Sequence, residues 1–530
     1  MGMKDCPAVA KMAGAKYWEH EFESFKAGVY VPDCDKIFDV INFGFKAPYL
    51  IVFEEIEQSA EERASFAVKS GLADIAGEKG GSVVFVFPTA GDWDKASPDL
   101  FKDLIAESKI HQYYRDGMVT FRDRFTGEYK DFFVRGAIFR TIVYASGKSA
   151  DYAARNLLKK IEGEYLWGPG DITPACVVLE GLSVIPKVER DDIPVISAGN
   201  SAEVNAALKN ACKHLLVKEN SDYVVDFKRF AGNFKRWCGI LEIEEDLDAL
   251  GVREELAVCE VKTSPDNCGD DKGTERHNVG YIAYYNKDLF EKGPAPLLLA
   301  FHGGGDSSLY ISHVSGWWKV AHRNNFLLVA VENHLNSTAT EMMELIAELK
   351  KKYNIDEHRI YASGFSMGGC KSWDMFQEYP EVFAGLAPMD ATFEVGLNVF
   401  GKPAPVEINR DTPVPVFYAG GEITPLPELP FQAEKCYDRA KYVFEVNKLV
   451  TPYNVKYEDR ENWPNKIWGI DGDRVEKFYD ESRESWLTVN YFKNAEGVET
   501  TALASISGQG HECREHTCEH AWQFLSQFTR

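Results

Sequence analysis

The feature that most constrains the fold is an alternation of apolar runs and helical stretches between residues 280 and 530. The apolar runs are continuous, which is typical of strands that are covered by helices on both faces. Strands and helices taken in turn predict an α/β fold with a mostly parallel sheet. We expect strands at 296–302, 326–332, 359–364, 382–389 and 414–420, and helices at 339–353 and 370–379.

The amino-acid sequence of the first half of the chain repeats this pattern of strands and helices. The matches keep their order, and their offsets are 301−87 = 214, 361−144 = 217 and 414−193 = 221. Collinear matches at nearly constant spacing predict two related α/β units in tandem. The matches are VVFVFPTAGD (83–92) with LLLAFHGGGD (297–306), YASGKS (144–149) with YASGFS (361–366), and IPVISAG (193–199) with VPVFYAG (414–420).

The length of the chain also favours two domains. Single cores stop growing at about 250–300 residues, and this chain has 530. We place the boundary near Cys238, which gives a first domain over residues 1–238 and a second over 239–530. Residues 239–295 are expected to form a β-rich segment that leads into the second domain, because AVCEV and VGYIAYY flank a polar turn.

Charge and composition exclude several classes of partner. The formal net charge of −23 repels nucleic acid and anionic membranes, so neither is expected as a partner. No run approaches the ~20 apolar residues of a membrane span, and the charged start lacks the apolar stretch of a secretory signal. We therefore expect a cytoplasmic protein whose eleven scattered cysteines are reduced. Self-association is left open by the sequence.

The strongest chemical motif is the pattern G-x-S-x-G at residues 364–368. It falls between an expected strand and an expected helix, the context in which a serine is exposed at a sharp turn. Ser366 is therefore the expected nucleophile. The glycines after His302 supply a second backbone donor, so the expected oxyanion hole pairs the N–H of Met367 with that of Gly303 or Gly304.

The catalytic acid and base are expected in later loops, in the order Ser, Asp or Glu, His. Glu422 follows the strand at 414–420, and His511 follows the last expected strand. His511 would take the proton of the serine, and Glu422 would orient the imidazole. Asp390, at the end of the strand at 382–389, is the alternative acid. The imidazole of His302 is expected to be structural.

The stretch HRIYASGFSMGG followed by EYPEVFAGLAPM resembles the esterase family that contains polyhydroxybutyrate depolymerases and feruloyl or acetylxylan esterases. The resemblance covers about residues 275–530 and implies the α/β-hydrolase fold. It also implies Ser366 as nucleophile, His511 as base and Glu422 as acid. Glu422 departs from the Asp that is usual in the family, and residues 448–495 form a longer segment than expected.

The first unit lacks these groups. Aligned by the letter matches, Pro88–Gly91 replaces the triple glycine, Ser201 replaces Glu422, and Ser149 has no activating neighbours. We therefore expect a degenerate, non-catalytic hydrolase-like domain. Gly147-Lys148-Ser149 is not a phosphate loop, because Ile142 stands where that motif needs glycine.

The sequence thus predicts a serine hydrolase that cleaves small ester substrates through an acyl-enzyme, without cofactor or metal. The His- and Cys-rich stretch 511–520 matches no usual zinc spacing. Trp317 and Trp318 are candidate substrate contacts, although tryptophan is more often a core residue. The alternatives are a serine peptidase or acyltransferase on the same fold, and a binding or scaffold protein without catalysis.

Overall fold

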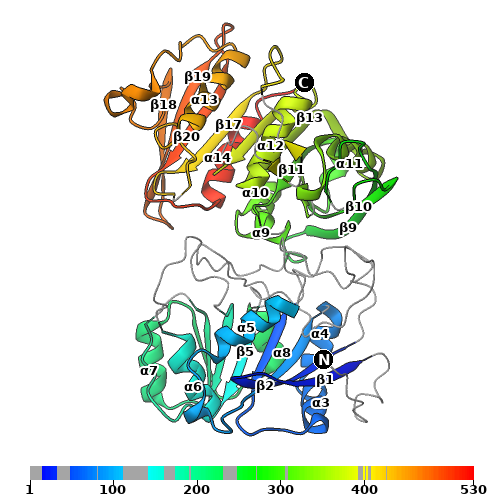
Figure 1. The fold of residues 1–530 in the computed structure, drawn as a ribbon, viewed down its shortest axis with the longest axis vertical. Coiled ribbons are helices and arrows are strands. Elements are labelled where there is room, and N and C mark those ends of the chain that lie inside the picture. The colour runs from blue at the N-terminus through cyan, green and yellow to red at the C-terminus, as the bar shows by residue number, and fades with distance from the viewer. Residues whose placement is uncertain are drawn as a thin grey trace. The chain divides into compact units, whose positions relative to one another are not determined.

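The chain divides into two compact units, Met1–Glu245 and Asp246–Arg530, seven residues (245−238) after the boundary expected from the sequence. Each unit contains one large sheet with helices packed on it (Figure 1). The computed structural model describes residues 15–32, 48–79, 81–111, 141–159, 174–189, 193–230, 247–269, 271–304, 308–332, 334–391, 398–399, 402–403, 407–424 and 426–530.

The second unit is built on a ten-stranded sheet of order β9-β10-β12-β11-β13-β14-β17-β20-β19-β18. The strands from β12 to β20 run parallel, and the two at each end are antiparallel to their neighbours. The strands are β9 (Val252–Lys262), β10 (Arg276–Asn286), β11 (Ala295–Phe301), β12 (Leu327–Val331), β13 (Ile355–Phe365), β14 (Gly385–Met389), β17 (Val416–Gly421), β18 (Arg474–Asp480), β19 (Ser485–Lys493) and β20 (Glu499–Ile506). A separate hairpin joins β15 (Asn398–Val399) and β16 (Lys402–Pro403).

Helices cover both faces of this sheet, as the continuous apolar runs predict. Every residue of β12 and β14 is buried, and their apolar side chains form one core with α11, α12 and α13. On the other face α10 packs against α14. The helices are α9 (Ser308–His313), α10 (Trp317–Asn324), α11 (Ala339–Lys352), α12 (Met367–Glu378), α13 (Glu434–Val446) and α14 (Glu515–Leu525), with 3-10 turns η5 (Leu289–Lys292), η6 (His334–Asn336) and η7 (Tyr457–Asn462).

The first unit has an eight-stranded sheet of order β1-β2-β4-β3-β5-β6-β7-β8. Its strands are β1 (Lys16–Glu21), β2 (Phe25–Val31), β3 (Tyr49–Phe53), β4 (Ser82–Pro88), β5 (Thr141–Ser146), β6 (Cys176–Glu180), β7 (Val195–Ala198) and β8 (Leu215–Lys218). Its helices are α3 (Ala60–Lys69), α4 (Leu72–Lys79), α5 (Leu100–His111), α6 (Lys148–Leu157), α7 (Ala202–Ala211) and α8 (Tyr223–Phe230), with a 3-10 turn η2 (Trp93–Lys95).

The two sheets share one strand order. Counted along the chain within each sheet, the first seven strands have the order 1-2-4-3-5-6-7 in both units. The eighth position is taken by β8 in the first unit and by β20 in the second, where the hairpin β18–β19, which precedes β20 in the chain, continues the sheet beyond β20. The two related α/β units expected from the sequence are therefore confirmed as a fold. One letter match pairs the wrong strands, however: β4 (residues 82–88) takes the place of β12, and β3 takes the place of β11. The error arose because buried strands draw on the same few apolar residues.

The unexpectedly long segment at 448–495 extends the sheet. It supplies β18 and β19, a hairpin that pairs with β20 through β19. The segment 239–295 supplies β9 and β10, which pair antiparallel at the other edge, although residues 239–246 lie outside the described part of the chain. No helix within the described ranges is long and apolar enough to cross a membrane.

Candidate active site

Ser366 lies at the sharp turn between β13 and α12. Its φ and ψ are 55° and −117°, a conformation that costs a residue with a side chain about 1–3 kcal/mol. Its N–H donates to the Met389 carbonyl at 2.9 Å, and its carbonyl accepts from the Cys370 N–H at 3.1 Å. The half-buried side chain therefore stands at the carboxyl end of the sheet, at the positive end of α12.

Glycines on both sides of this serine allow the turn to pack closely. A Cβ at Gly364 would lie 2.0 Å from the Gly368 carbonyl oxygen, and a Cβ at Gly368 would lie 2.1 Å from the Phe301 carbonyl oxygen. A Cβ at Gly369 would lie 2.4 Å from the Cβ of Ala391. Larger residues would push the turn away from β11 and β14, so the glycines of the motif are required by packing.

The loop after β11 approaches the first residue of α12. A Cβ on Gly304 would lie 2.4 Å from the Met367 sulfur, so the loop contacts that side chain. Gly303 is buried next to it, and Gly305 lies outside the described residues. Because the first N–H groups of a helix have no partner within the helix, the Met367 amide can act as a donor. The loop and the helix start thus lie side by side, as an oxyanion site requires.

His302 anchors the beginning of this loop. The side chain is buried, and its ring nitrogens hydrogen-bond to the carbonyls of Gly303 (2.7 Å) and Glu332. Its ring centroid lies 4.4 Å from that of His334, whose pKa is lowered well below the ordinary value because the ring is buried. These contacts agree with the structural role expected for His302.

His511 lies in the loop between β20 and α14. Its Nδ1 hydrogen-bonds to Oε1 of Glu428, and both side chains are almost completely buried. Its ring packs on Phe365, with the centroids 4.7 Å apart. Since Phe365 directly precedes Ser366, the imidazole lies against the turn that holds the serine. A carboxylate on Nδ1 selects the tautomer whose lone pair is on Nε2.

The partner of His511 is a glutamate that the sequence did not single out. Glu428 lies in the same loop after β17 as Glu422, seven residues past the end of the strand (428−421). Glu422 points elsewhere, because its carboxylate accepts a 2.8 Å hydrogen bond from the Ser505 hydroxyl. The expected pairing of Glu422 with His511 is therefore corrected to Glu428. The correct loop was predicted, and a search for every acid within it would have found both residues.

Asp390, the alternative acid, lies beside the same pair. Its carboxyl accepts the Gly421 N–H at 2.8 Å and the side-chain amide of Gln509 at 3.3 Å. It is also a hydrogen-bonding neighbour of the Glu428 carboxyl. Burial, followed by the charge of Glu428, raises the pKa of Asp390 well above its ordinary value. The site therefore contains two adjacent carboxyl groups and one imidazole.

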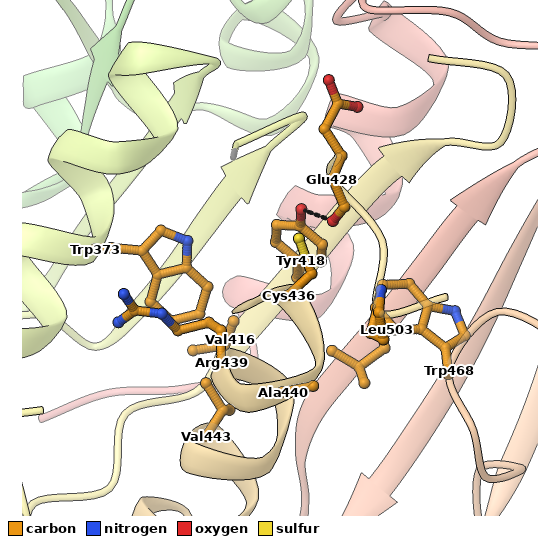
Figure 2. Close-up of a pocket in the computed structure, with 11 residues that line it drawn as sticks. Trp373, Val416, Tyr418, Glu428, Cys436, Arg439, Ala440, Val443, Trp468 and Leu503 are labelled. Carbon is orange, nitrogen blue, oxygen red and sulfur yellow. Dashed lines mark hydrogen bonds between the residues drawn. The ribbon is translucent and has the colours of Figure 1, made fainter. Parts of the chain in front are cut away.

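Glu428 is held from both ends. Its carboxylate accepts the Thr424 hydroxyl at 2.8 Å, and its backbone carbonyl accepts the Tyr418 hydroxyl. Below it lies a cavity of about 20 Å³, enough for about one water molecule. Figure 2 shows the Glu428 carboxylate pointing away from this cavity. Burial raises the pKa of Glu428 to about 7, against the hydrogen bonds from Asp390 and Thr424, which lower it.

The tryptophans expected as substrate contacts are core residues. Trp317 and Trp318 are 0% and 2% exposed, and they pack near Phe326 and His313 respectively. A ring with no accessible face cannot stack on a substrate, so this expectation is corrected. The apolar neighbours of α10, which the sequence could not identify, bury both rings.

The His- and Cys-rich stretch 511–520 separates into independent contacts. His511 binds Glu428, while the sulfurs of Cys513 and Cys518 lie 3.6 Å apart. His520 stacks on Phe478 with ring centroids 3.8 Å apart. In the part of the chain that the structure describes, no three His, Cys, Asp or Glu side chains are arranged to hold a metal ion.

The first unit has the same turn without the serine. Gly147 precedes α6 with φ 53° and ψ −125°, close to the values for Ser366. Its N–H donates to the Glu180 carbonyl at 2.9 Å and its carbonyl accepts from the Asp151 N–H at 3.1 Å, the pattern seen around Ser366. The letter match that aligned Ser149 with Ser366 is therefore shifted by two residues.

Ser149 takes the place of Gly368 instead. It is buried, and its hydroxyl donates to the Phe53 carbonyl at 2.7 Å, just as Gly368 packs on the Phe301 carbonyl. Phe53 thus corresponds to Phe301, and the glycine loop of the second unit corresponds to residues 54–57, Glu-Glu-Ile-Glu. The earlier alignment with Pro88–Gly91 is corrected accordingly.

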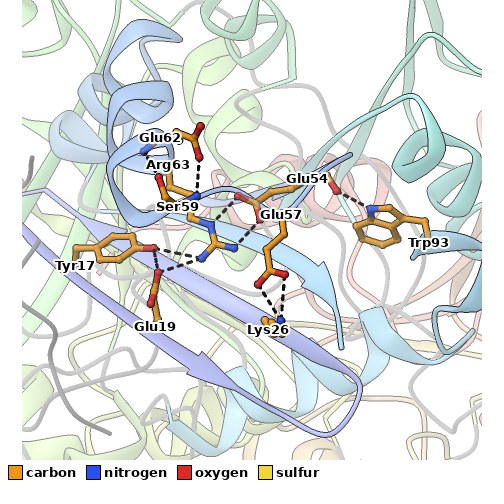
Figure 3. Close-up of polar contacts among 9 residues, drawn as sticks. All are labelled: Tyr17, Glu19, Lys26, Glu54, Glu57, Ser59, Glu62, Arg63 and Trp93. Atoms are coloured by element: carbon orange, nitrogen blue, oxygen red, sulfur yellow. Dashed lines mark hydrogen bonds and ion pairs between the residues drawn. The ribbon is translucent and has the colours of Figure 1, made fainter. Parts of the chain in front are cut away.

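This acidic loop is fixed by an ion pair. The Arg63 guanidinium donates from Nε and Nη2 to the two oxygens of Glu54, each at 2.7 Å, and Trp93 donates to the Glu54 carbonyl (Figure 3). The carboxylate of Glu55 lies over Gly147, because a Cβ there would be 2.0 Å from Glu55 Oε1. The Glu55 carboxylate therefore lies against the turn of the first unit, at the place where the second unit has its glycine loop.

Comparison with known proteins gives partial matches. No protein-family profile matches the chain. The chain is 29% identical over 136 residues to the bifunctional acetylxylan esterase/xylanase XynS20E of Neocallimastix patriciarum, which covers 24% of this chain and 19% of that protein. It is 27% identical over 114 residues to the poly(3-hydroxyalkanoate) depolymerase C of Paucimonas lemoignei, which covers 18% and 27%. The chain thus spans about a fifth to a quarter of the length of these curated relatives.

Among solved structures, an S-formylglutathione hydrolase from Staphylococcus aureus aligns with a TM-score of 0.32 and 12% identity. The alignment covers 51% of this chain and 97% of that structure. The α/β fold of the second unit rests on the strand order that it shares with the first unit and on the turn before α12, and not on this TM-score.

Proposed function

We propose that this chain, an α/β-hydrolase related to an acetylxylan esterase and a poly(3-hydroxyalkanoate) depolymerase, is a serine esterase whose active site lies in the second unit. The observation that carries the proposal is the packing of the His511 ring on Phe365, the residue before Ser366. That contact joins the strained serine to the buried His511–Glu428 pair. A serine, an imidazole and a carboxylate in this order are the groups that acyl transfer needs.

Ser366 is the proposed nucleophile, His511 the base, and Glu428, in place of Glu422, the acid. The Ser366 oxygen attacks the ester carbonyl while its proton passes to Nε2 of His511. The positive imidazolium is stabilised by Glu428, which accepts the Nδ1 hydrogen bond. The alcohol leaves with the proton from Nε2, and an acyl group remains on Ser366. Water, deprotonated by the same imidazole, then releases the acid.

The proposed oxyanion hole is formed by the Met367 N–H and the N–H of Gly303 or Gly304. Support comes from the contact between Gly304 and Met367, which brings the loop and the start of α12 together. Two preorganised donors at this position stabilise the tetrahedral intermediate, and losing one such donor typically costs about 10²–10³-fold in kcat.

The proposed substrates are small uncharged esters with a short acyl group. The names of the two relatives refer to acetyl and hydroxyalkanoyl esters, so these acyl groups are the first to test. A panel of acetyl, butyryl, feruloyl and 3-hydroxybutyryl esters would rank them by kcat/KM. Ser366→Ala should abolish turnover of p-nitrophenyl acetate, and unchanged turnover in that variant would end the proposal.

Two alternatives use the same fold. A peptidase or an acyltransferase differs only in the leaving group or the acceptor, so matched anilide and ester substrates, and added alcohol acceptors, separate them from an esterase. A binding protein without catalysis would not react with a fluorophosphonate probe. Labelling of the wild type but not of Ser366→Ala would exclude it.

The first unit is proposed to be non-catalytic. Gly147 leaves it without a nucleophile, and the Glu55 carboxylate lies against the turn where an oxyanion would need donors. Negative charge at that position destabilises an oxyanion rather than stabilising it. The cytoplasmic location, the absence of nucleic-acid or membrane partners, and self-association stay predictions. The net charge of −23 is the argument against anionic partners.

A further inference from the structure

A buried carboxyl group beside the proposed triad has no role in the mechanism above. Asp390 directly follows β14 and has a φ of 43°, in the left-handed region that residues other than glycine and asparagine rarely adopt. Its side chain is 1% exposed. Strained and buried polar residues cluster at functional sites.

The contacts of Asp390 turn it toward Glu428. Its backbone N–H donates to the Ala419 carbonyl at 2.8 Å, which ties it to the strand that precedes the Glu428 loop. Its Oδ1 accepts the Gly421 N–H at 2.8 Å, and the same N–H also faces the Glu428 carboxyl. The two carboxyl groups therefore share one donor and lie within hydrogen-bonding reach of each other.

Two carboxyl groups this close, both almost fully buried, do not both ionise, because like charges in a poorly solvated site repel. The charge belongs on Glu428, since its Oε1 receives the hydrogen bonds from His511 and from the Thr424 hydroxyl. The proton therefore belongs on Asp390. Burial raises the pKa of Asp390 well above its ordinary value, in agreement with this assignment.

We infer that Asp390 is a positioning residue that stays protonated and donates a hydrogen bond from its carboxyl to the carboxylate of Glu428, so that a single negative charge is held opposite His511. The inference rests on the proposed function. The donated hydrogen bond stabilises the ionised form of Glu428 and orients it. Asp390 does not touch the reacting atoms and acts through Glu428.

The other groups around the pair do not supply this role. Tyr418 on β17 donates its hydroxyl to the backbone carbonyls of Ala391 and Glu428. On α13, the Arg439 guanidinium lies over the ring of Trp373, 5.5 Å from its centroid. His511 after β20 is the other titratable group whose charge acts on Asp390, whereas Cys370 on α12 and Cys436 on α13 act on Tyr418.

The test compares Asp390→Gly with the conservative variant Asp390→Asn. Glycine accepts the φ of 43° without strain but removes the donor. Asparagine keeps a donor of the same shape and adopts this φ readily. The measurement is the pH profile of kcat/KM for p-nitrophenyl acetate, with fluorophosphonate labelling of Ser366 and thermal unfolding as checks on folding.

In Asp390→Gly the acid limb of kcat/KM should move up by about 0.5–1 pH unit, because Glu428 loses a hydrogen bond to its ionised form. At a pH on that limb this corresponds to about three- to tenfold lower kcat/KM. Asp390→Asn should restore the limb to within about 0.2 unit of the wild type, as expected when one donor replaces another.

Three outcomes would overturn the inference. If both variants shift the limb to lower pH, Asp390 is ionised in the wild type. If neither variant shifts it, the two carboxyl groups are not coupled. If Asp390→Asn loses about 10³-fold while Glu428→Gln does not, Asp390 is itself the triad acid. Failure of the proposed function is recognised separately, by turnover that survives Ser366→Ala.

Discussion

The two units share one backbone scaffold but differ in the residue at the turn and in the loop beside it. In both, the first seven strands have the order 1-2-4-3-5-6-7, and a turn of nearly identical φ and ψ precedes a helix that starts at Lys148 or Met367. In one unit the turn residue is Gly147 and the neighbouring loop is acidic. In the other it is Ser366 and the loop is rich in glycine.

The comparison separates the requirements of fold from those of chemistry. The left-handed turn, its two backbone hydrogen bonds and the parallel strands around it are found without a nucleophile, so the topology alone provides them. Reactivity needs side chains from three separate loops. The first unit keeps the scaffold, and we propose that it has lost the reaction.

The contrast between the two units would be contradicted most clearly if the second unit hydrolysed esters without Ser366. Ser366→Ala should lower kcat for p-nitrophenyl acetate by about 10⁴-fold or more, since removal of the nucleophile leaves only binding and oxyanion stabilisation. Initial rates on the purified protein measure this. The matched control is Ser149→Ala, which removes a buried structural hydroxyl of the first unit and should change kcat less than about twofold.

The next largest effect on kcat is expected from replacing the proposed catalytic acid, Glu428. Glu428→Gln should lower kcat by about 10²–10⁴-fold, because the imidazolium loses its stabilising charge. Glu422→Gln, in the same loop but bonded to Ser505, should stay within about threefold of the wild type. Equal losses in the two variants, or the reverse order, would restore Glu422 as the acid.

A serine at the turn of the first unit, at position 147, should not give that unit esterase activity. Gly147→Ser should give no hydrolysis in a Ser366→Ala background, since the site has acidic side chains in place of donors. It should destabilise the protein by about 1–3 kcal/mol through strain at positive φ, measured by urea unfolding. Gly91→Ser, at φ 74° with nothing within 4 Å, controls for the strain alone. Activity in the double variant would show that the first unit retains its machinery.

The smallest effect is on the pH dependence of stability. Burial raises the pKa of Glu428 from 4.5 to about 7 in the folded protein. A group whose folded pKa is raised contributes stability below its unfolded pKa and loses that contribution as pH rises through about 7. Relative to the wild type, Glu428→Gln should therefore gain stability as the pH rises from about 4.5 to about 7, and the difference should stay level above that. Parallel unfolding curves across that range would argue against a raised pKa.

Much of the site was predictable because its parts are local. The turn at Ser366 was expected from glycine spacing between a strand and a helix, and the packing of Gly364 and Gly368 explains that spacing. Ser366 as the nucleophile stays a proposal. His511 was expected in the loop after the last parallel strand, and it lies there, although its assignment as the base stays a proposal. The expected strands of the second unit lie within a few residues of observed ones, but β18 and β19 were not expected.

The wrong predictions concerned features that depend on loop path, strand register and burial. Glu422 and Glu428 lie in one loop, and its path decides that only Glu428 reaches His511. Ser149 matched Ser366 by its letters, but the register of β3 with β5 puts Gly147 at the turn. Trp317 and Trp318 were buried by neighbours that are distant in the sequence.

The amino-acid sequence by itself determined the alternation of buried strands and helices, the tandem repeat and the motif around Ser366, because each follows from residue type and short-range spacing. The tertiary structure decided which carboxylate meets the imidazole, which residue of the first unit stands at the turn, and which side chains are buried. Those outcomes depend on strand register and loop path, which are set by contacts between residues far apart along the chain.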